Sequence, residues 1–531
     1  MARGKFFKGT VLLALAGFFT KLIGAVYRIP LARLLGPEGM GLYQMAYPVY
    51  TVLWALSAAG VPVAVSLLVA GQRSGITGRS NGRVLTGALV FMALVGAFFS
   101  WLVYLGAAFF AQHILHEPRA YYAIVAISPA VFFASLSAVF RGYFQGFQEM
   151  GPTAASQVLE QVVRVATVLA LVYYFLPYGL EVAAAGAAFG AVTGALASLV
   201  LLYIIFRKWQ AAGLPAAAGG RPLLLETVAV GRELVRTALP LSLGSIVLPL
   251  MQVVDASIVP LRLQEAGLSP RQATEQFGLL AGMATTLINL PAIVPVALAT
   301  SLVPVVYEAY LAGRYPVLHA RLRTAVRITA LLMIPAAVGL WVLATPISRL
   351  LYDLPEVGRP LRYLAPGVLF FGLYQVCAGA LQGLGKTYLP AVHLLVGVLI
   401  KSYLSYWLVT WPFLGINGAA LATVVGFGTA FWLNYRALRK LTGFGVAWSF
   451  AGRPALAAAI MAAVVYWVYG ELVALLGNNV TCLLAVGVGG LTYAVGLLAL
   501  GAVETGDLQQ LHGGPFMSKI IRALEKLRLL R

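Results

Sequence analysis

The stretch Val84–His116, VLTGALVFMALVGAFFSWLVYLGAAFFAQHILH, contains no Asp, Glu, Lys or Arg. A helix needs about 20 mainly apolar residues to cross the hydrocarbon core of a bilayer, so this stretch is long enough to span one. Strands of a membrane barrel would be short and alternate between polar and apolar residues, whereas this run is continuous. The stretch therefore predicts a transmembrane helix, and the chain an all-α polytopic membrane protein.

Similar uncharged runs recur along the whole chain and predict about fourteen spans. The spans lie near residues 9–35, 42–70, 84–112, 120–147, 153–176, 181–206, 233–263, 276–311, 320–350, 361–383, 389–411, 416–438, 453–475 and 480–503. The segment after the last span, 504–531, has an amphipathic basic pattern, which predicts a cytoplasmic helix lying on the anionic inner leaflet. Two cysteines, Cys377 and Cys482, fall in apolar runs and are expected to be interior residues.

Charge is scarce and unevenly distributed in this chain. Of 531 residues, 61% are hydrophobic and 10% charged, and 37 Lys and Arg face 17 Asp and Glu, for a net charge of +20. Soluble proteins carry about 25% charged residues. With the N-terminus inside, 26 cations fall on the cytoplasmic side, Arg141 among them, and six fall outside. This split follows the positive-inside rule and predicts a multi-pass protein of the cytoplasmic membrane with both termini cytoplasmic. Nucleic-acid binding is then unnecessary to explain the charge.

The chain also contains an internal repeat. Ser128-Pro129 and Ala365-Pro366, Phe144-Gln145-Gly146 and Leu381-Gln382-Gly383, and Arg164 and Lys401 are each separated by 237 residues. We predict two pseudo-symmetric six-helix lobes followed by two extra helices. The predicted divisions are an N-lobe at 1–206, a basic linker at 207–232, a C-lobe at 233–440, the two extra spans at 441–503 and the tail at 504–531. Transporters built from parallel repeats bind their substrates near the midplane, between the repeats.

Ionisable residues within spans are the candidates for function, because a charge in the bilayer is costly and faces a polar interior. They are Lys21, Arg28, Arg33, Glu160, Arg164, Asp255 and Lys401. Glu160 and Arg164 are four residues apart and can form a self-neutralised pair. Arg164 and Lys401 occupy equivalent repeat positions and face one cavity or snorkel to the interface. Asp255 relays a proton or sodium ion, or pairs with a cavity cation. His393 is expected to be a satisfied interior residue.

The first seventy residues carry a family resemblance. Lys8-Gly-Thr-Val-Leu-Leu, Thr20-Lys-Leu-Ile-Gly and the segment from Pro30 to Pro48 are followed by Gly60-Val-Pro-Val-Ala-Val-Ser. This pattern resembles the stage V sporulation protein B and MurJ-like polysaccharide biosynthesis proteins of the multidrug/oligosaccharidyl-lipid/polysaccharide flippase superfamily. The resemblance implies a V-shaped pair of lobes, a central cationic cavity, and flipping of an undecaprenyl-pyrophosphate-linked saccharide by alternating access. An Arg-Asp pair of MurJ-type proteins aligns with Tyr27-Arg28, so the cavity carries over in part.

We therefore predict a flippase for a lipid-linked cell-wall or polysaccharide precursor, working as a monomer among membrane lipids. Arg28, Arg164 and Lys401 are the predicted head-group contacts, with Lys21 and Arg33 as further cations. Asp255 and Glu160 are the coupling or cavity acids. We expect no catalytic residue, metal or cofactor, and coupling to the membrane potential, H+ or Na+ stays open. The alternatives are a cation-coupled multidrug exporter and, in another class, a membrane glycosyltransferase or polymerase. The exporter would need more embedded acids. The enzyme would need a constellation of catalytic acids on its outer loops.

Overall fold

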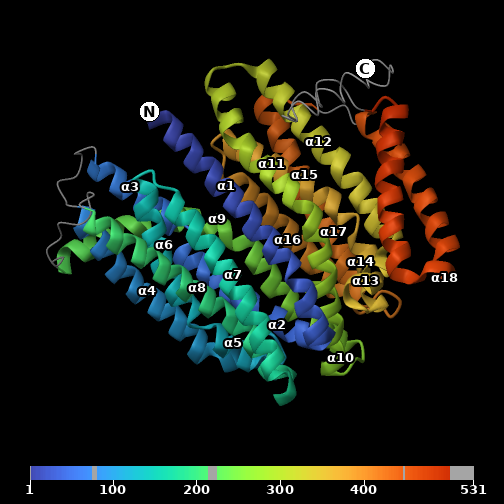
Figure 1. Cartoon of the computed structure of the whole chain (residues 1–531), viewed down its shortest axis with the longest axis horizontal. Coiled ribbons are helices and arrows are strands. Elements are labelled where there is room, and N and C mark those ends of the chain that lie inside the picture. Colours follow the sequence, from blue (N-terminus) through green and yellow to red (C-terminus); the bar gives the residue numbers. More distant parts are fainter. Residues whose placement is uncertain (1, 74–80, 213–223, 446–448, 503–531) are drawn as a thin grey trace. The chain divides into compact units, whose positions relative to one another are not determined.

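The computed structural model describes residues 2–73, 81–212, 224–445 and 449–502, and within those ranges the chain is helical without a β-strand (Figure 1). Packing divides it into two compact units, with the boundary between Met283 and Ala284. The predicted all-α membrane fold is confirmed. The predicted interfacial tail at 504–531 lies outside the described residues.

The described residues of unit 1 form ten α-helices with short 3-10 and π segments between them, and the last π segment ends one residue beyond Met283. They are α1 (Ala2–Val26), α2 (Arg28–Ala58), α3 (Val61–Arg73), α4 (Asn81–Phe109), η1 (Phe110–Ile114), η2 (Pro118–Ala120), α5 (Tyr121–Ile127), α6 (Ala130–Gly146), α7 (Gly151–Phe175), η3 (Leu176–Tyr178), α8 (Leu180–Ala211), α9 (Leu224–Glu265), α10 (Pro270–Phe277) and η4 (Gly278–Ala284). Its core contains a large cluster of apolar side chains from α3, α4, α6, α8 and α9.

The described residues of unit 2 are also helical. Its elements are α11 (Thr285–Leu311), α12 (Tyr315–Val342), α13 (Ala344–Tyr352), η5 (Pro355–Val357), α14 (Gly358–Leu364), α15 (Gly367–Gly383), α16 (Tyr388–Leu408), α17 (Ile416–Thr442) and α18 (Ser449–Ala499). Cys377 lies on α15 and Cys482 on α18, and both are buried, as expected.

The lipid-facing surface can be recognised on α4. Leu94, Phe98, Trp101 and Leu105 follow a helical spacing along one face, and each is 63–67% exposed. On another face Met92 is buried against the unit. A contiguous apolar face of this kind would be unfavourable in water, and in a bilayer it is solvated by acyl chains.

Among the described residues, eleven helical stretches are long and apolar enough to cross a membrane, or twelve if the bent pair Pro355–Leu364 and Gly367–Gly383 is one span. The stretch Leu15–Gln72 is interrupted at Gly36, with φ 66° and ψ −179°, and Ala451–Ala499 at Gly477, with φ 71° and ψ 169°. Only glycine adopts such angles readily. At about 1.5 Å per residue, each stretch far exceeds the ~30 Å core of a bilayer. Both are therefore long enough to cross twice, and the count of fourteen stays a prediction.

Secondary structure follows the repeat seen in the sequence. The bounds of η2 and η5, of α5 and α14, and of α6 and α15 all differ by 237 residues at both ends. The same local sequence signals, such as the proline at the start of η2 and η5, therefore produce the same elements twice.

The division into lobes at 207–232 rests on this repeat and stays a prediction, because packing places the boundary elsewhere. Helix α9 belongs to unit 1 rather than to the later helices. The backbone N–H of Gly60 donates to Ser242 Oγ on α9 at 3.2 Å, and a Cβ at Gly60 would lie 2.3 Å from the carbonyl oxygen of Ala238. Residues 213–223 of the predicted linker lie outside the described residues.

Candidate functional site

Glu160 on α7 is the centre of a polar cluster inside unit 1. Its Oε1 accepts from Arg164 Nη2 at 2.7 Å, and its Oε2 accepts from Arg141 Nη2 at 2.7 Å. Arg141, on α6, also donates to Ser156 Oγ at 3.0 Å and to Ser198 Oγ at 2.8 Å. One carboxylate therefore holds two guanidinium groups from neighbouring helices. The predicted Glu160–Arg164 pair is present, and it is part of a larger network.

Tyrosine side chains from α2 form the neighbouring surface of this cluster. Tyr43, Tyr47 and Tyr50 follow a helical spacing, with ring centroids 5.6 and 5.8 Å apart. Arg164 Nη1 lies 3.4 Å from the hydroxyl of Tyr47. The hydroxyls of Tyr27 and Tyr43 are 3.3 Å apart, and Arg28 lies beside these rings. We call Arg28, the four tyrosines, Arg141, Glu160 and Arg164 the arginine–tyrosine cluster.

Small residues allow the helices to approach closely around the cluster. A Cβ at Gly194 on α8 would lie 2.7 Å from the carbonyl oxygen of Glu160 and 3.1 Å from Cβ of Arg164. A Cβ at Gly24 on α1 would lie 3.1 Å from Nε2 of Gln161 on α7. The glycine at position 194 thus allows α8 to pack closely against α7 beside Glu160 and Arg164.

The arginine–tyrosine cluster is positively charged. Three arginines against one carboxylate leave two net positive charges. The Nε atoms of Arg28 and Arg164 are buried without a hydrogen-bond partner in the described part of the chain. A buried donor without a partner is unfavourable until an acceptor arrives. The arrangement can therefore bind an anionic group, with phenolic hydroxyls available for further hydrogen bonds.

Three predicted residues lie outside this cluster. Lys21 on α1 and Arg33 on α2 are exposed side chains. Asp255 is half-buried on α9, which packs in unit 1. Whether Asp255 couples transport to an ion stays a prediction.

Lys401, on α16, is a buried cation of unit 2, with 3% of its surface exposed. It lies where α16 crosses α17, since a Cβ at Gly426 would be 3.0 Å from Cβ of Lys401. At the repeat offset of 237, Gly397 stands where unit 1 has Glu160, and Ala378 where it has Arg141. The acid and the second arginine are thus particular to unit 1. A shared cavity for Arg164 and Lys401 stays a prediction.

Sequence reasoning missed Arg141 and the tyrosines. Arg141 was counted with the cytoplasmic connections, which is wrong, because it lies inside α6 and pairs with Glu160. Its place within the predicted span 120–147 was a usable signal. The spacing of Tyr43, Tyr47 and Tyr50 puts them on one helical face and could also have been noticed. His393 is satisfied as expected, with Nδ1 2.8 Å from Asn434 Oδ1.

A second polar group, which we call the Glu117 tie, joins three segments of unit 1. Arg119 forms ion pairs with Glu38 on α2 and, at 2.7 Å, with Glu117. Thr274 on α10 donates to Glu117 Oε2 at 2.6 Å. Burial alone would raise the pKa of Glu117, but the hydrogen bonds from Arg119 and Thr274 outweigh it and hold the pKa below its ordinary value.

Comparison with known proteins identifies the family. Residues 6–310 match the family described as polysaccharide biosynthesis protein, and residues 280–407 match the family described as MatE. The chain belongs to the polysaccharide biosynthesis protein family. It is 35% identical over 430 residues to stage V sporulation protein B of Bacillus subtilis (strain 168), covering 80% of this chain and 82% of that protein. It is 28% identical over 461 residues to the lipid II flippase MurJ of the same organism, covering 83% and 84%.

Solved structures give the same fold for this family member. The lipid II flippase MurJ in an inward closed conformation superposes with a TM-score of 0.68 at 17% identity, covering 92% of this chain and 98% of that one. A multidrug resistance transporter of the MATE family, from the MOP superfamily, gives 0.65 at 16% identity, covering 80% and 94%. The resemblance stated from the first seventy residues is confirmed. The chain is a multi-pass membrane protein of the MOP flippase and transporter superfamily, and two of the proteins it resembles are named as a flippase and a transporter.

Proposed function

We propose that this protein flips a polyprenyl-pyrophosphate-linked saccharide, a lipid II-like precursor of wall or polysaccharide synthesis, across the cytoplasmic membrane. The observation that carries the proposal is the net-positive arginine–tyrosine cluster at membrane depth, in which the Nε atoms of Arg28 and Arg164 have no hydrogen-bond partner among the described residues. The kinship with a protein named lipid II flippase supports the same substrate class.

The chemistry of the substrate suits this cluster. A pyrophosphate carries negative charge that guanidinium groups bind through short, paired hydrogen bonds. Such bonds are stronger in an interior of low dielectric constant than in water. The lipid tail stays in the bilayer while the head group crosses by alternating access. Lys401, Lys21 and Arg33 add cations along the route, and Asp255 is the candidate for coupling to H+ or Na+, unless the membrane potential drives transport.

The deciding experiment is a flipping assay with purified protein in liposomes that contain lipid II, with and without a membrane potential. We expect Arg28→Ala to abolish flipping, because it removes a cation with an uncommitted donor. Arg323→Ala, at an exposed position on α12, is the matched control and should flip normally. In cells, Arg28→Ala should fail to complement a flippase-depleted strain at normal expression. Full activity of the Arg28 variant would reject the assignment.

A cation-coupled drug exporter of the same superfamily is the second candidate, favoured by the structural match to a multidrug transporter. A cationic drug needs an available carboxylate. In the described part of the chain, Glu160 already binds two arginines. Drug-susceptibility assays discriminate, because an exporter raises tolerance to cationic dyes, and the proposed flippase leaves it unchanged.

A further inference from the structure

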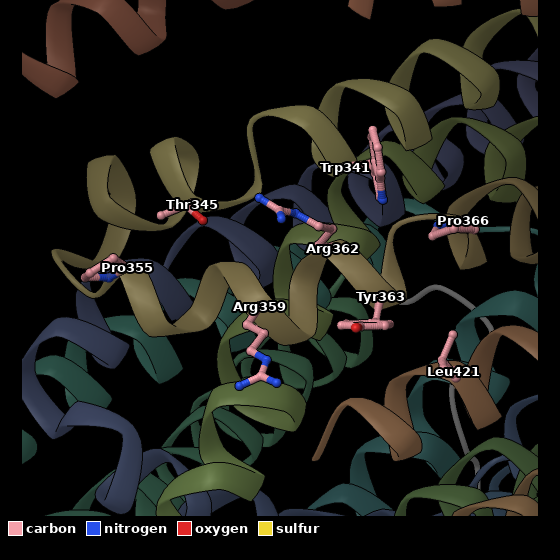
Figure 2. Close-up of a pocket in the computed structure, with 8 residues that line it drawn as sticks. All are labelled: Trp341, Thr345, Pro355, Arg359, Arg362, Tyr363, Pro366 and Leu421. Atoms are coloured by element: carbon pink, nitrogen blue, oxygen red, sulfur yellow. The ribbon is translucent and has the colours of Figure 1, made fainter. Parts of the chain in front are cut away.

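A pocket of about 590 Å³ lies in unit 2, at the end where α12 is followed by α13 and α14. It is lined by Trp341, Thr345, Arg359, Arg362 and Tyr363, among others (Figure 2). Its volume is within the range of ligand-binding pockets. All of its lining residues belong to unit 2, so it is separate from the arginine–tyrosine cluster of unit 1.

Arg362 is the uncommitted cation of this pocket. Figure 2 shows its side chain extending from α14 toward Thr345, while that of Arg359 extends away from Thr345. Arg359 Nη2 donates to the carbonyl oxygen of Phe413 at 3.3 Å. Among the described residues Arg362 makes no hydrogen bond, ion pair or ring contact, even with the exposed acids Asp353 and Glu356 of the same connection. A guanidinium group with five free donors is available for an acceptor.

The repeat supplies an internal comparison. Unit 1 has a pocket of about 340 Å³ beside Pro129, which is the repeat equivalent of Pro366 in the unit 2 pocket. The smaller pocket is lined by alanine, serine, proline and aromatic residues, with no charged side chain. At the offset of 237, Tyr122 and Val125 stand where unit 2 has Arg359 and Arg362. The two arginines are therefore not required by the fold at this position.

Exposed aromatic side chains place the pocket near a membrane interface. Trp341 is 53% exposed, and Trp411 and Phe413, on the connection that Arg359 contacts, are 47% and 66% exposed. Trp and Tyr are enriched at the head-group level of membranes, so Trp341 and Trp411 favour this depth for the pocket. The charge pattern of the sequence puts the 349–362 connection on the outer side. A ligand here would meet lipid head groups before it met bulk solvent.

We propose that this pocket binds the phosphate of an anionic lipid head group at the outer face of the membrane. Arg362 provides the charge, the hydroxyls of Thr345 and Tyr363 add hydrogen bonds, and Trp341 covers the apolar part of the head group. The phosphate belongs to a bilayer phospholipid or to a polyprenyl carrier on that side, and both present the same chemistry to Arg362. This site is additional to the proposed transport cluster and does not depend on it.

Lipid binding to the purified full-length protein in detergent tests the proposal, with native mass spectrometry and thermal shift as readouts. The probes are phosphatidylglycerol, undecaprenyl phosphate and phosphatidylcholine, whose zwitterionic head group has no net charge and serves as the control. We expect Arg362→Gln to weaken binding of an anionic probe by about tenfold, as for loss of one charged hydrogen-bond pair. Arg362→Lys should retain part of the affinity. Arg349→Gln, an exposed arginine of α13 outside the pocket, should bind like the wild type.

The outcomes distinguish a bilayer phospholipid from a polyprenyl carrier as the source of the bound phosphate. Weaker phosphatidylglycerol binding in the Arg362 variant identifies a bilayer lipid, and weaker undecaprenyl phosphate binding alone identifies the carrier. Equal affinity of Arg362→Gln and Arg349→Gln for both anionic probes overturns the proposal. A normal melting temperature of the Arg362 variant without lipid shows that lost binding is not lost folding. Flipping activity is measured in parallel, so a failure of the transport proposal is seen separately.

Discussion

At the residue scale, Glu160 binds two arginines that differ in what else they do. Arg141 donates through Nε and Nη2 to Ser156, Ser198 and Glu160. Arg164 shares the same carboxylate and contacts the hydroxyl of Tyr47, but its buried Nε has no hydrogen-bond partner in the part of the chain that the structure describes. The first arginine therefore serves mainly to hold α6, α7 and α8 together. The second retains capacity for a ligand.

This difference predicts that alanine at Arg141 mainly lowers stability, whereas alanine at Arg164 mainly lowers flipping activity. Arg141→Ala should lower the melting temperature in detergent, at a cost of about 2 kcal/mol or more for a broken, partly buried network. Arg164→Ala should be milder for stability, because Glu160 keeps Arg141, and should abolish lipid II flipping. Paired melting curves and flipping rates for both variants check this. Equal losses of stability and of flipping in the two variants would contradict the division of roles.

At the element scale, the backbone of α2 closely approaches the backbone of α10 and of the first residue of η4. A Cβ at Gly278 would lie 1.8 Å from the carbonyl oxygen of Pro37, and one at Gly41 would lie 2.2 Å from that of Thr274. Real Cβ atoms do not approach so closely, so any larger residue forces the segments apart. The Glu117 tie joins the same segments and depends on their spacing.

We expect Gly278→Ala to destabilise unit 1 strongly, by several kcal/mol, because overpacking against backbone cannot be relieved by a rotamer change. Gly244→Ala on α9 is the matched control, since nothing lies within 4 Å of its Cβ. Alanine there should be neutral or stabilise the helix by up to about 1 kcal/mol. Melting temperatures of the two purified variants give the comparison, and a tolerant Gly278 variant would show that α2 and α10 do not pack this way.

The Glu117 tie also predicts a pH dependence. Its lowered pKa means that the ionised form is favoured by folding, so its stabilisation is present above the ordinary value of 4.5. That stabilisation is lost as the pH falls through the lower folded pKa. Glu117→Gln should therefore melt at a lower temperature than the wild type at pH 7, and this difference in melting temperature should shrink as the pH falls below 4.5. Glu356→Gln, at an exposed position, should melt at the same temperature as the wild type. A difference in melting temperature that does not change with pH for Glu117→Gln would argue against the ion pairs.

At the scale of the whole molecule, uncharged runs such as 84–116 were sufficient to predict helices, because lipid permits few other backbone solutions. The 237-residue offset carried over to η2 and η5 because equivalent prolines start both. The Glu160–Arg164 pair was predictable because both lie on one helix. Arg141 was not predicted to belong to the arginine–tyrosine cluster, because its partner Glu160 is on another helix. Pairing across helices depends on packing. The placement of α9 in unit 1 also depends on such contacts, which no local pattern encodes.

The orientation of the molecule can be tested around α14 and α15, where the bent pair Pro355–Leu364 and Gly367–Gly383 is a candidate single span. Arg362 precedes α15 and Lys386 follows it, and both side chains are exposed. The native cysteines are buried, so background labelling should be low. The positive-inside rule puts Lys386 in the cytoplasm and Arg362 outside. A membrane-impermeant maleimide should therefore label Arg362→Cys in intact cells, and Lys386→Cys only after permeabilisation. If both were labelled from the same side, this pair would be a re-entrant loop, and the outer placement of the Arg362 pocket would lose its support from topology.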